Sequence, residues 1–352
     1  MTAIVRFVPS RHEIINERHE TILEAALRAG LPVSYGCTNG SCGQCKAKLI
    51  SGQLEKTQFH DYVLTQAEKE QGVFLLCSHA ALTDAVVEVT EAKGVQDIPL
   101  QEISTRIKKI DHPAKDVVIL TLRTPRSKSL RFIAGQRCGL SISPDIGNTL
   151  SIASCPCDSM NLQFHIRHIP NETFSEYVFS RLTSSVSIDI IGPSGEFILD
   201  EDSTRPILFI AFDTDFGPVK SLIEHAISLE LSQPMHFYWL SLFENGHYLH
   251  NYCRSLMDAM DNFEFTPLVG FSEDQQPDSP QEYQLKLNQF LASQALIEKS
   301  FTPVFDEYPD MGAYDVYIAA PSSLVSAIKP LFLQQKLPNL RLFVEMTDQL
   351  AA

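Results

Sequence analysis

The stretch YGCTNGSCGQCKAKL, residues 35–49, places three cysteines in a loop that is rich in glycine and small polar residues. Cys37, Cys42 and Cys45 follow the spacing C-x4-C-x2-C, and Cys77 lies further along the chain in GVFLLCSHA. This is the plant-type spacing of the ligands of a 2Fe-2S cluster. It predicts an iron-sulfur site with these four thiolates as metal ligands.

The residues between the cysteines favour the same interpretation. Glycines allow tight turns that direct backbone N–H groups toward an anionic cluster. Zinc sites usually pair two C-x2-C knuckles, and no second cysteine lies close to Cys77. A disulfide framework would leave the glycine-rich loop unexplained. The sequence therefore favours iron over zinc or structural thiols.

The flanking segments predict a small fold around this loop. An apolar-faced helix is predicted over residues 20–30, and short strands are predicted at residues 3–9, 12–16, 46–55 and 85–92. Residues 1–92 resemble the plant-type ferredoxin domain. The resemblance implies a β-grasp fold, a cluster held by Cys37, Cys42, Cys45 and Cys77, and a one-electron carrier of low potential.

The rest of the chain divides by its pattern of apolar runs. Residues 93–102 have the mixed polarity of a linker. Short, regularly spaced runs over residues 103–200 predict an antiparallel β-barrel of six-stranded type. Strands and helices alternate over residues 205–347, which predicts a doubly wound parallel sheet. The expected fold class is thus multidomain, α+β followed by α/β.

This order of domains resembles the ferredoxin-containing NAD(P)H oxidoreductases that serve oxygenases and deoxysugar dehydrases. The segments FIAGQ, LSIAS, IGPSGEF and YDVYIAAP are similar to that family in sequence and in place. The resemblance implies that the barrel binds FAD and that the α/β domain binds NAD(P)H.

The chain departs from the family at the positions that should contact these cofactors. The Arg-x-Tyr-Ser flavin motif reads NTLS at residues 148–151, and Asn171 and Glu172 fill the glycine positions of the flavin-phosphate loop. The Gly-Gly-Thr-Gly turn becomes Phe212–Asp215, and the Gly-x-Arg after the next strand becomes Leu240–Leu242. Ala319, Ala320 and Pro321 replace the family's Cys-Gly-x-Pro.

These departures predict that the cofactors are lost. Two unit charges about 4 Å apart interact by about 4 kcal/mol at an effective dielectric of 20, so Asp213, Asp215 or Glu172 beside a phosphate should oppose binding. FAD and NAD(P)H are therefore unlikely, with no residue expected to bind them and no catalytic residue expected. Ser151, Arg167, Ser175 and the GPSGEF turn are retained from the family pattern.

The expected function is one-electron transfer. The cluster would take electrons from a separate reductase and pass them to an oxygenase-type enzyme, with the reductase-like module as a vestigial docking scaffold. The first alternative is an active FAD-dependent NAD(P)H oxidoreductase, the reductase component of an oxygenase system. The second is a redox-sensing or interaction protein. Whether the chain is an enzyme stays open at this point.

Composition excludes other classes. The net charge of -15, without clusters of Lys and Arg, argues against nucleic-acid binding. No apolar run approaches the roughly 20 residues that cross a bilayer, and the first residues do not form a secretory signal. A cytoplasmic protein without membrane insertion is expected. Cys155 and Cys157 lack further metal ligands nearby, so they are interpreted, like Cys138 and Cys253, as structural residues.

Overall fold

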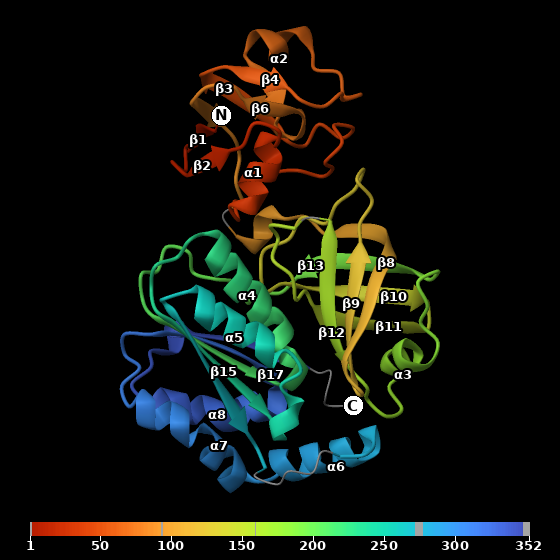
Figure 1. The fold of residues 1–352 in the computed structure, drawn as a ribbon, viewed down its shortest axis with the longest axis vertical. Helices are drawn as coiled ribbons and strands as arrows, with labels where there is room; N and C mark the ends of the chain where they lie inside the picture. Colours follow the sequence, from red (N-terminus) through yellow and green to blue (C-terminus); the bar gives the residue numbers. More distant parts are fainter. Residues whose placement is uncertain (1, 93, 159, 272–276, 348–352) are drawn as a thin grey trace.

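The computed structural model describes residues 2–92, 94–158, 160–271 and 277–347. Three bodies follow one another along the chain, each built on its own β-sheet (Figure 1). The N-terminal body lies at the top of the view, the antiparallel sheet below it on the right, and the parallel sheet with its helices at the lower left. The predicted fold class is confirmed.

The N-terminal body contains a five-stranded sheet of order β2-β1-β7-β3-β5, in which β1 pairs with β7 in parallel. The helix α1 (Ile22–Arg28) begins at a capping box between Thr21 and Glu24, and its apolar face is buried. The remaining elements are β1 (Ala3–Val8), β2 (Glu13–Asn16), β3 (Lys46–Ser51), β4 (Leu54–Lys56), α2 (Gln66–Glu70), β5 (Val73–Leu75), the 3-10 turn η1 (Leu76–Ser78), β6 (His79–Ala81) and β7 (Ala85–Glu88).

The middle body is a six-stranded antiparallel sheet of order β11-β10-β13-β8-β9-β12, curved into a half-barrel around an apolar core. One helix, α3 (Thr173–Ser180), contributes Phe174 and Val178 to this core. The 3-10 turn η2 (Val95–Asp97) precedes the sheet, whose strands are β8 (Gln101–Ala114), β9 (Val117–Arg123), β10 (Arg137–Ser143), β11 (Ile146–Ser151), β12 (Asn161–Arg167) and β13 (Ser187–Ser194).

The C-terminal body is a parallel sheet of order β16-β15-β14-β17-β18, with helices on both faces (Figure 1). Its strands are β14 (Ile207–Phe212), β15 (Met235–Ser241), β16 (Phe263–Val269), β17 (Asp315–Pro321) and β18 (Leu342–Thr347). The helices are α4 (Phe216–Ser228), α5 (His250–Ala259), α6 (Pro280–Leu291), α7 (Gln294–Glu307) and α8 (Ser322–Gln334), with 3-10 turns η3 (Asp213–Asp215), η4 (Glu244–Gly246) and η5 (Asn339–Arg341).

Strand β14 is apolar at every position because helices cover both faces of this sheet. Along β14, Phe209 and Ala211 pack with residues of α4 and α5, whereas Leu208, Ile210 and Phe212 pack with residues of α6, α7 and α8. Successive side chains point to opposite faces, so every position of β14 is buried. The strand therefore reads as a continuous apolar run, as the sequence predicted.

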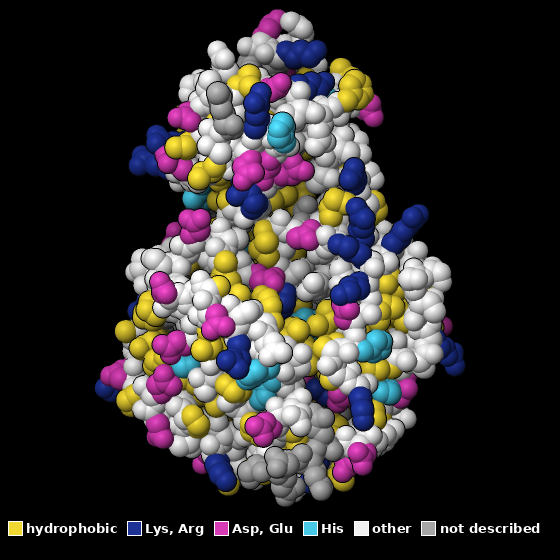
Figure 2. All heavy atoms as spheres, in the orientation of Figure 1, with side chains coloured by type: hydrophobic (Ala, Val, Ile, Leu, Met, Phe, Trp, Pro, Cys, Tyr) yellow, Lys and Arg dark blue, Asp and Glu magenta, His cyan; other side chains and the backbone are white. Residues whose placement is uncertain are grey.

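The N-terminal body rests on the middle body through the connection between β9 and β10. Ser129 N–H donates to the carbonyl of Gly36 at 3.2 Å, and Thr38 N–H donates to the carbonyl of Arg126 at 3.0 Å. Figure 1 shows this connection rising beside the N-terminal body. The molecule narrows at this junction, which Figure 2 shows as a waist below the upper lobe.

No helix in the described ranges is both long and apolar enough to span a bilayer.

Candidate iron-sulfur centre and reductase sites

The structure brings the four predicted ligands together. Cys37, Cys42 and Cys45 lie in the loop between α1 and β3, and Cys77 lies in η1 after β5. The sulfurs of Cys45 and Cys77 are 3.3 Å apart. Cys42 N–H donates to Cys37 Sγ at 3.4 Å, and Gln44 N–H donates to Cys42 Sγ at the same distance. Backbone amides therefore already point at the sulfurs, as an anionic cluster requires.

The loop conformation depends on two glycines. Gly40 and Gly43 have φ of 76° and 72°, in the left-handed region that favours glycine. A Cβ at Gly40 would lie 2.3 Å from His60 Cβ, and one at Gly43 would lie 2.3 Å from the ring of Tyr62. The segment that contains His60 and Tyr62 therefore lies directly against the cysteine loop, with no space for side chains at these two positions.

The ionisation of the thiols suits metal binding. Burial acts to raise the pKa of Cys37, but hydrogen bonds from Cys42 and Ser41 outweigh it and lower the pKa to about 7. The hydrogen bond between Cys45 and Cys77 lowers the pKa of Cys45 and raises that of Cys77. Both sulfurs would be thiolates when they hold iron. Four converging sulfurs, three of them buried, are a donor set that fits a 2Fe-2S cluster.

The positions that the family uses for flavin are occupied by other contacts. Leu150 on β11 is buried in the barrel core, in the same cluster as Phe174 of α3. Glu172 precedes α3, and its carboxylate accepts hydrogen bonds from the backbone N–H groups of Phe174 and Ser175 at 3.1 and 2.6 Å. These N–H groups are the anion site of the helix N-terminus. A flavin phosphate fits there only if the Glu172 carboxylate moves away.

Arg167, which is retained from the family pattern, forms ion pairs with two carboxylates. Its Nε and Nη2 lie 2.8 and 2.6 Å from Asp213 Oδ1, and its Nη1 donates to Asp116. Burial acts to lower the pKa of Arg167, but the charges of Asp213 and Asp116 outweigh it and raise the pKa. The guanidinium also lies over the ring of Tyr283, 4.1 Å from its centroid. Arg167 therefore ties the half-barrel to the turn after β14.

The turn after β14, η3, contains polar atoms that have hydrogen-bond partners and others that have none. Asp213 is completely buried, with φ of 53°, and its carbonyl accepts a hydrogen bond from Trp239 Nε1 at 2.9 Å. Asp213 Oδ2, Thr214 Oγ1 and Asp215 Oδ2 have no hydrogen-bond partner among the described residues. Burial raises the pKa of Asp215 well above its ordinary value, which favours the neutral acid. These oxygens have almost no exposed surface, so a ligand could contact them only if the turn moved.

The other departing positions lie inside the parallel sheet. Leu240 and Leu242, at and after the end of β15, are buried, and so are Ala319 and Ala320 on β17. Phe212 is buried at the end of β14, and its ring stacks on Phe290 of α6 at a centroid distance of 6.2 Å. These residues form part of the core, so at these positions the structure presents apolar surface where the family has cofactor contacts.

Comparison with known proteins shows what each part of this chain is similar to. Residues 6–82 match the family described as the 2Fe-2S iron-sulfur cluster binding domain. The remaining residues form a ferredoxin-reductase-like module, and the chain as a whole combines an iron-sulfur domain with that module.

The relatives are similar over almost the whole chain. The CDP-6-deoxy-L-threo-D-glycero-4-hexulose-3-dehydrase reductase of Yersinia pseudotuberculosis is 26% identical, with 97% of this chain and 98% of that protein covered. The reductase component of propane 2-monooxygenase from Gordonia is also 26% identical, with 97% and 96% covered. Among solved structures, the cytochrome P450 reductase GcoB of Amycolatopsis has a TM-score of 0.60 at 21% identity, with 98% of both chains covered.

These comparisons correct two predictions. The interpretation as an electron carrier with a vestigial module and a separate reductase is wrong, because relatives that align with the module as well as the iron-sulfur domain are reductases. The prediction that FAD and NAD(P)H are unlikely is contradicted by the same relatives and by the shared fold.

The electrostatic argument failed for a physical reason. It treated Asp213 and Asp215 as bare charges. In the structure the charge of Asp213 is compensated by Arg167, and burial favours the neutral form of Asp215. Sequence inspection also missed the pairing of Arg167 with Asp213 and Asp116, because no local pattern links residues so far apart in the chain.

Replacement of a predicted ligand tests the iron-sulfur centre. Cys45→Ser should lower iron and acid-labile sulfide to below about one tenth of the wild-type content, because a serine hydroxyl does not ionise to replace a thiolate. Cys253→Ser, at a buried cysteine of the C-terminal body, is the control and should retain the cluster. Equal cluster content in the two variants would contradict the assignment.

Removal of the Asp213 charge tests the buried ion pair. Asp213→Asn should lower the free energy of unfolding by about 3 kcal/mol, because the guanidinium of Arg167 keeps only the more exposed Asp116. Asparagine tolerates the positive φ, so the loss of charge is the main change. Asp116→Asn is the matched control, with an expected loss of about 1 kcal/mol. The single tryptophan, Trp239, touches Asp213 and reports urea unfolding by fluorescence. Equal losses would contradict the central role of Asp213.

Proposed function

We propose that this protein is a flavin-dependent NAD(P)H oxidoreductase, the reductase component of a system in which a partner enzyme receives electrons from the 2Fe-2S cluster. The partner is an enzyme of oxygenase or deoxysugar-dehydrase type, as the names of the relatives suggest. Cys37, Cys42, Cys45 and Cys77 are the proposed iron ligands.

The contact between the cysteine loop and the half-barrel is the observation that carries the proposal. Gly36 and Thr38, on either side of Cys37, exchange backbone hydrogen bonds with Ser129 and Arg126. Tyr35 Oη adds a hydrogen bond to the carbonyl of Leu130 at 3.3 Å. A carrier that serves two separate proteins needs its cluster loop free for both, whereas here one side of the loop faces the chain's own module. This arrangement favours electron entry from within the chain.

The module holds buried polar groups near the edge where an electron donor would bind. FAD, when bound, would accept the two electrons of a hydride together and release them singly. The retained Ser151 and Arg167 lie on β11 and β12, and the unpaired oxygens of η3 lie at the carboxyl edge of the parallel sheet. That edge is where doubly wound sheets bind their ligands. Glu172 and the Arg167 ion pair are the groups that must rearrange to admit phosphates.

The proposed partner surface is the side of the junction that carries Arg126 and Lys128, and it is basic although the chain as a whole has a net negative charge. Arg126 and Lys128 are exposed on the segment that bonds to the cysteine loop. Lys and Arg side chains gather along the right side of the junction in Figure 2. Complementary charge accelerates the encounter of electron-transfer partners more than it tightens their complex. An acceptor with an acidic surface near its redox centre fits this side of the molecule.

Pyridine-nucleotide reduction of the cluster tests the proposed activity. Anaerobically purified protein, supplied with excess FAD, should show bleaching of the cluster absorption on addition of NADH or NADPH. Cys45→Ser should still oxidise the nucleotide with a flavin-reactive dye as acceptor, because only the exit of electrons through the cluster is removed. Failure of both nucleotides to bleach the cluster in the presence of FAD would contradict the proposal.

Charge reversal tests the partner surface. Arg126→Glu combined with Lys128→Glu should slow oxidation of the dithionite-reduced cluster by ferricyanide, an anion, about threefold to tenfold at low ionic strength. High salt should remove the difference, because exposed charges are screened. The control is Arg254→Glu with Lys299→Glu, two exposed positions on α5 and α7. A neutral quinone should oxidise the wild type and the Arg126→Glu/Lys128→Glu variant at equal rates. A slower reaction of this variant with the quinone would argue against electrostatic attraction.

A further inference from the structure

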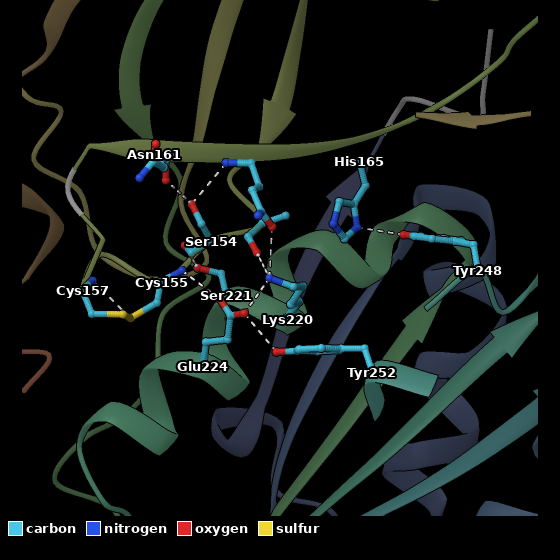
Figure 3. Close-up of polar contacts among 12 residues, drawn as sticks. Ser154, Cys155, Cys157, Asn161, His165, Lys220, Ser221, Glu224, Tyr248 and Tyr252 are labelled. Atoms are coloured by element: carbon cyan, nitrogen blue, oxygen red, sulfur yellow. Dashed lines mark hydrogen bonds and ion pairs between the residues drawn. A yellow bond between two sulfur atoms is a disulfide. The ribbon is translucent and has the colours of Figure 1, made fainter. Parts of the chain in front are cut away.

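Cys155 and Cys157 have no part in the proposed function. The sequence predicted two structural residues, whereas the structure joins them in a disulfide. They lie in the connection from β11 to β12, which packs against α4 of the C-terminal body. Figure 3 shows the pair beside Ser221 and Glu224 of that helix, with Lys220 close by.

A stabilising role does not account for this disulfide. It closes a loop of only three residues, with Pro156 between the cysteines. The entropy that a crosslink removes from the unfolded chain grows with the length of the closed loop, so a crosslink this short contributes little. By that relation the bond removes only about half the entropy that a crosslink over 15 residues would remove. A chemical role is the alternative that the geometry allows.

The two sulfurs differ in access. Cys155 is buried, with 3% of its surface exposed, whereas Cys157 is partly exposed. Both line a cavity of about 470 Å³, together with Asn161, Lys220 and Tyr252. That volume is within the range of small-molecule sites. An incoming nucleophile therefore reaches Cys157 Sγ, and Cys155 Sγ is the leaving atom.

The leaving sulfur is already stabilised. Cys157 N–H donates to Cys155 Sγ at 3.1 Å, and Ser228 Oγ lies 3.8 Å from the same sulfur. A hydrogen bond to sulfur favours the thiolate, and a more stable leaving thiolate is expelled faster. When Cys155 is a thiol, its S–H can donate a hydrogen bond to the hydroxyl oxygen of Ser228, because the Ser228 O–H is itself donated to the carbonyl of His225.

The surrounding contacts hold the loop in place when the bond opens. Cys155 N–H donates to Glu224 Oε2 at 3.1 Å, and Lys220 Nζ lies 2.6 Å from the other oxygen of Glu224. Lys220 also donates to the carbonyl of Ala153 at 3.1 Å. Ser221 Oγ donates to the carbonyl of Ser154 at 2.8 Å. Because none of these bonds involves a cysteine sulfur, the two sulfurs remain adjacent in either redox state.

We propose that Cys155 and Cys157 form a site of reversible thiol–disulfide exchange whose substrate is a low-molecular-weight thiol of the glutathione class. The proposal does not rest on the reductase function, because it uses neither the iron-sulfur cluster nor a nucleotide.

The reaction balances with the thiol as the only reductant. A thiolate attacks Cys157 Sγ, the bond between the two cysteine sulfurs breaks, and Cys155 leaves as a thiolate that takes up a proton. A second thiolate then attacks the sulfur of the first thiol, forms the external disulfide and releases Cys157 as a thiolate. Two thiols are oxidised to one disulfide, and the protein disulfide is reduced to two thiols.

Mass spectrometry on the full-length, cluster-loaded protein tests this proposal. The protein is incubated with reduced glutathione, quenched with acid and alkylated, and the peptide that contains Cys155 and Cys157 is measured apart from the cluster peptides. The expected result is two alkylated cysteines after reduced glutathione, and loss of both on return to glutathione disulfide. A disulfide that opens only after the protein is unfolded would overturn the proposal, and so would a peptide that stays fully thiol under glutathione disulfide.

Single variants identify the attacked sulfur. In Cys155→Ser, glutathione disulfide should form a mixed disulfide on Cys157. In Cys157→Ser, the buried Cys155 should react about tenfold more slowly. Cys138→Ser, at a buried cysteine of the half-barrel, is the control and should behave as wild type. Equal rates at Cys155 and Cys157 would overturn the assigned direction of attack.

A stability measurement separates exchange from a structural role. The double variant Cys155→Ser with Cys157→Ser should melt within about 2 °C of the oxidised wild type, because the three-residue loop contributes little entropy. A much larger fall in melting temperature would identify a structural crosslink and overturn the proposal, whatever the alkylation pattern.

Discussion

The buried guanidinium of Arg167 is the interaction on which the arrangement of the two larger bodies depends. A charge removed from water costs several kcal/mol unless it is paired, and Arg167 finds its partners on different elements. Asp116 lies between β8 and β9 of the half-barrel, Asp213 lies in the turn after β14, and Tyr283 lies on α6. Separation of the bodies would remove Asp213 and Tyr283 and leave this charge with Asp116 alone. The ion pair therefore fixes the turn at the carboxyl edge of the parallel sheet against the barrel.

The iron-sulfur body is held by a weaker kind of contact. Its junction uses the backbone hydrogen bonds of Gly36 and Thr38 with Ser129 and Arg126, and a bond from the half-buried Arg131 to Ser34, with no ion pair among these groups. A neutral hydrogen bond contributes only about 0.5–1.5 kcal/mol net, so these bonds define an orientation with less stabilisation than a buried ion pair supplies. The half-barrel and the parallel sheet are thus joined more firmly than the iron-sulfur body is joined to them. This difference agrees with the proposal that the iron-sulfur body also contacts a second protein.

The sequence predicted local features well and distant pairings poorly. The spacing of Cys37, Cys42, Cys45 and Cys77 and the apolar run of β14 depend on neighbouring residues, and the structure contains both features. The interpretation of Asp213 failed because its partner Arg167 comes from another body. Glu172 was predicted to oppose a phosphate, and the structure adds a contact that spacing alone did not predict, the capping of its own helix. The bond between Cys155 and Cys157 was missed because spacing alone does not separate a thiol pair from a disulfide.

The carboxylate of Glu172 occupies the backbone N–H groups at the start of α3, so it competes with any anion for that site. A carboxylate tethered one residue before a helix acts at a high effective concentration, which no dilution of the protein reduces. Any phosphate that binds there must displace it, so the apparent dissociation constant equals the intrinsic one divided by the fraction of the protein in which α3 is uncapped. The occupancy of this site then depends on the concentration of free ligand relative to this larger dissociation constant.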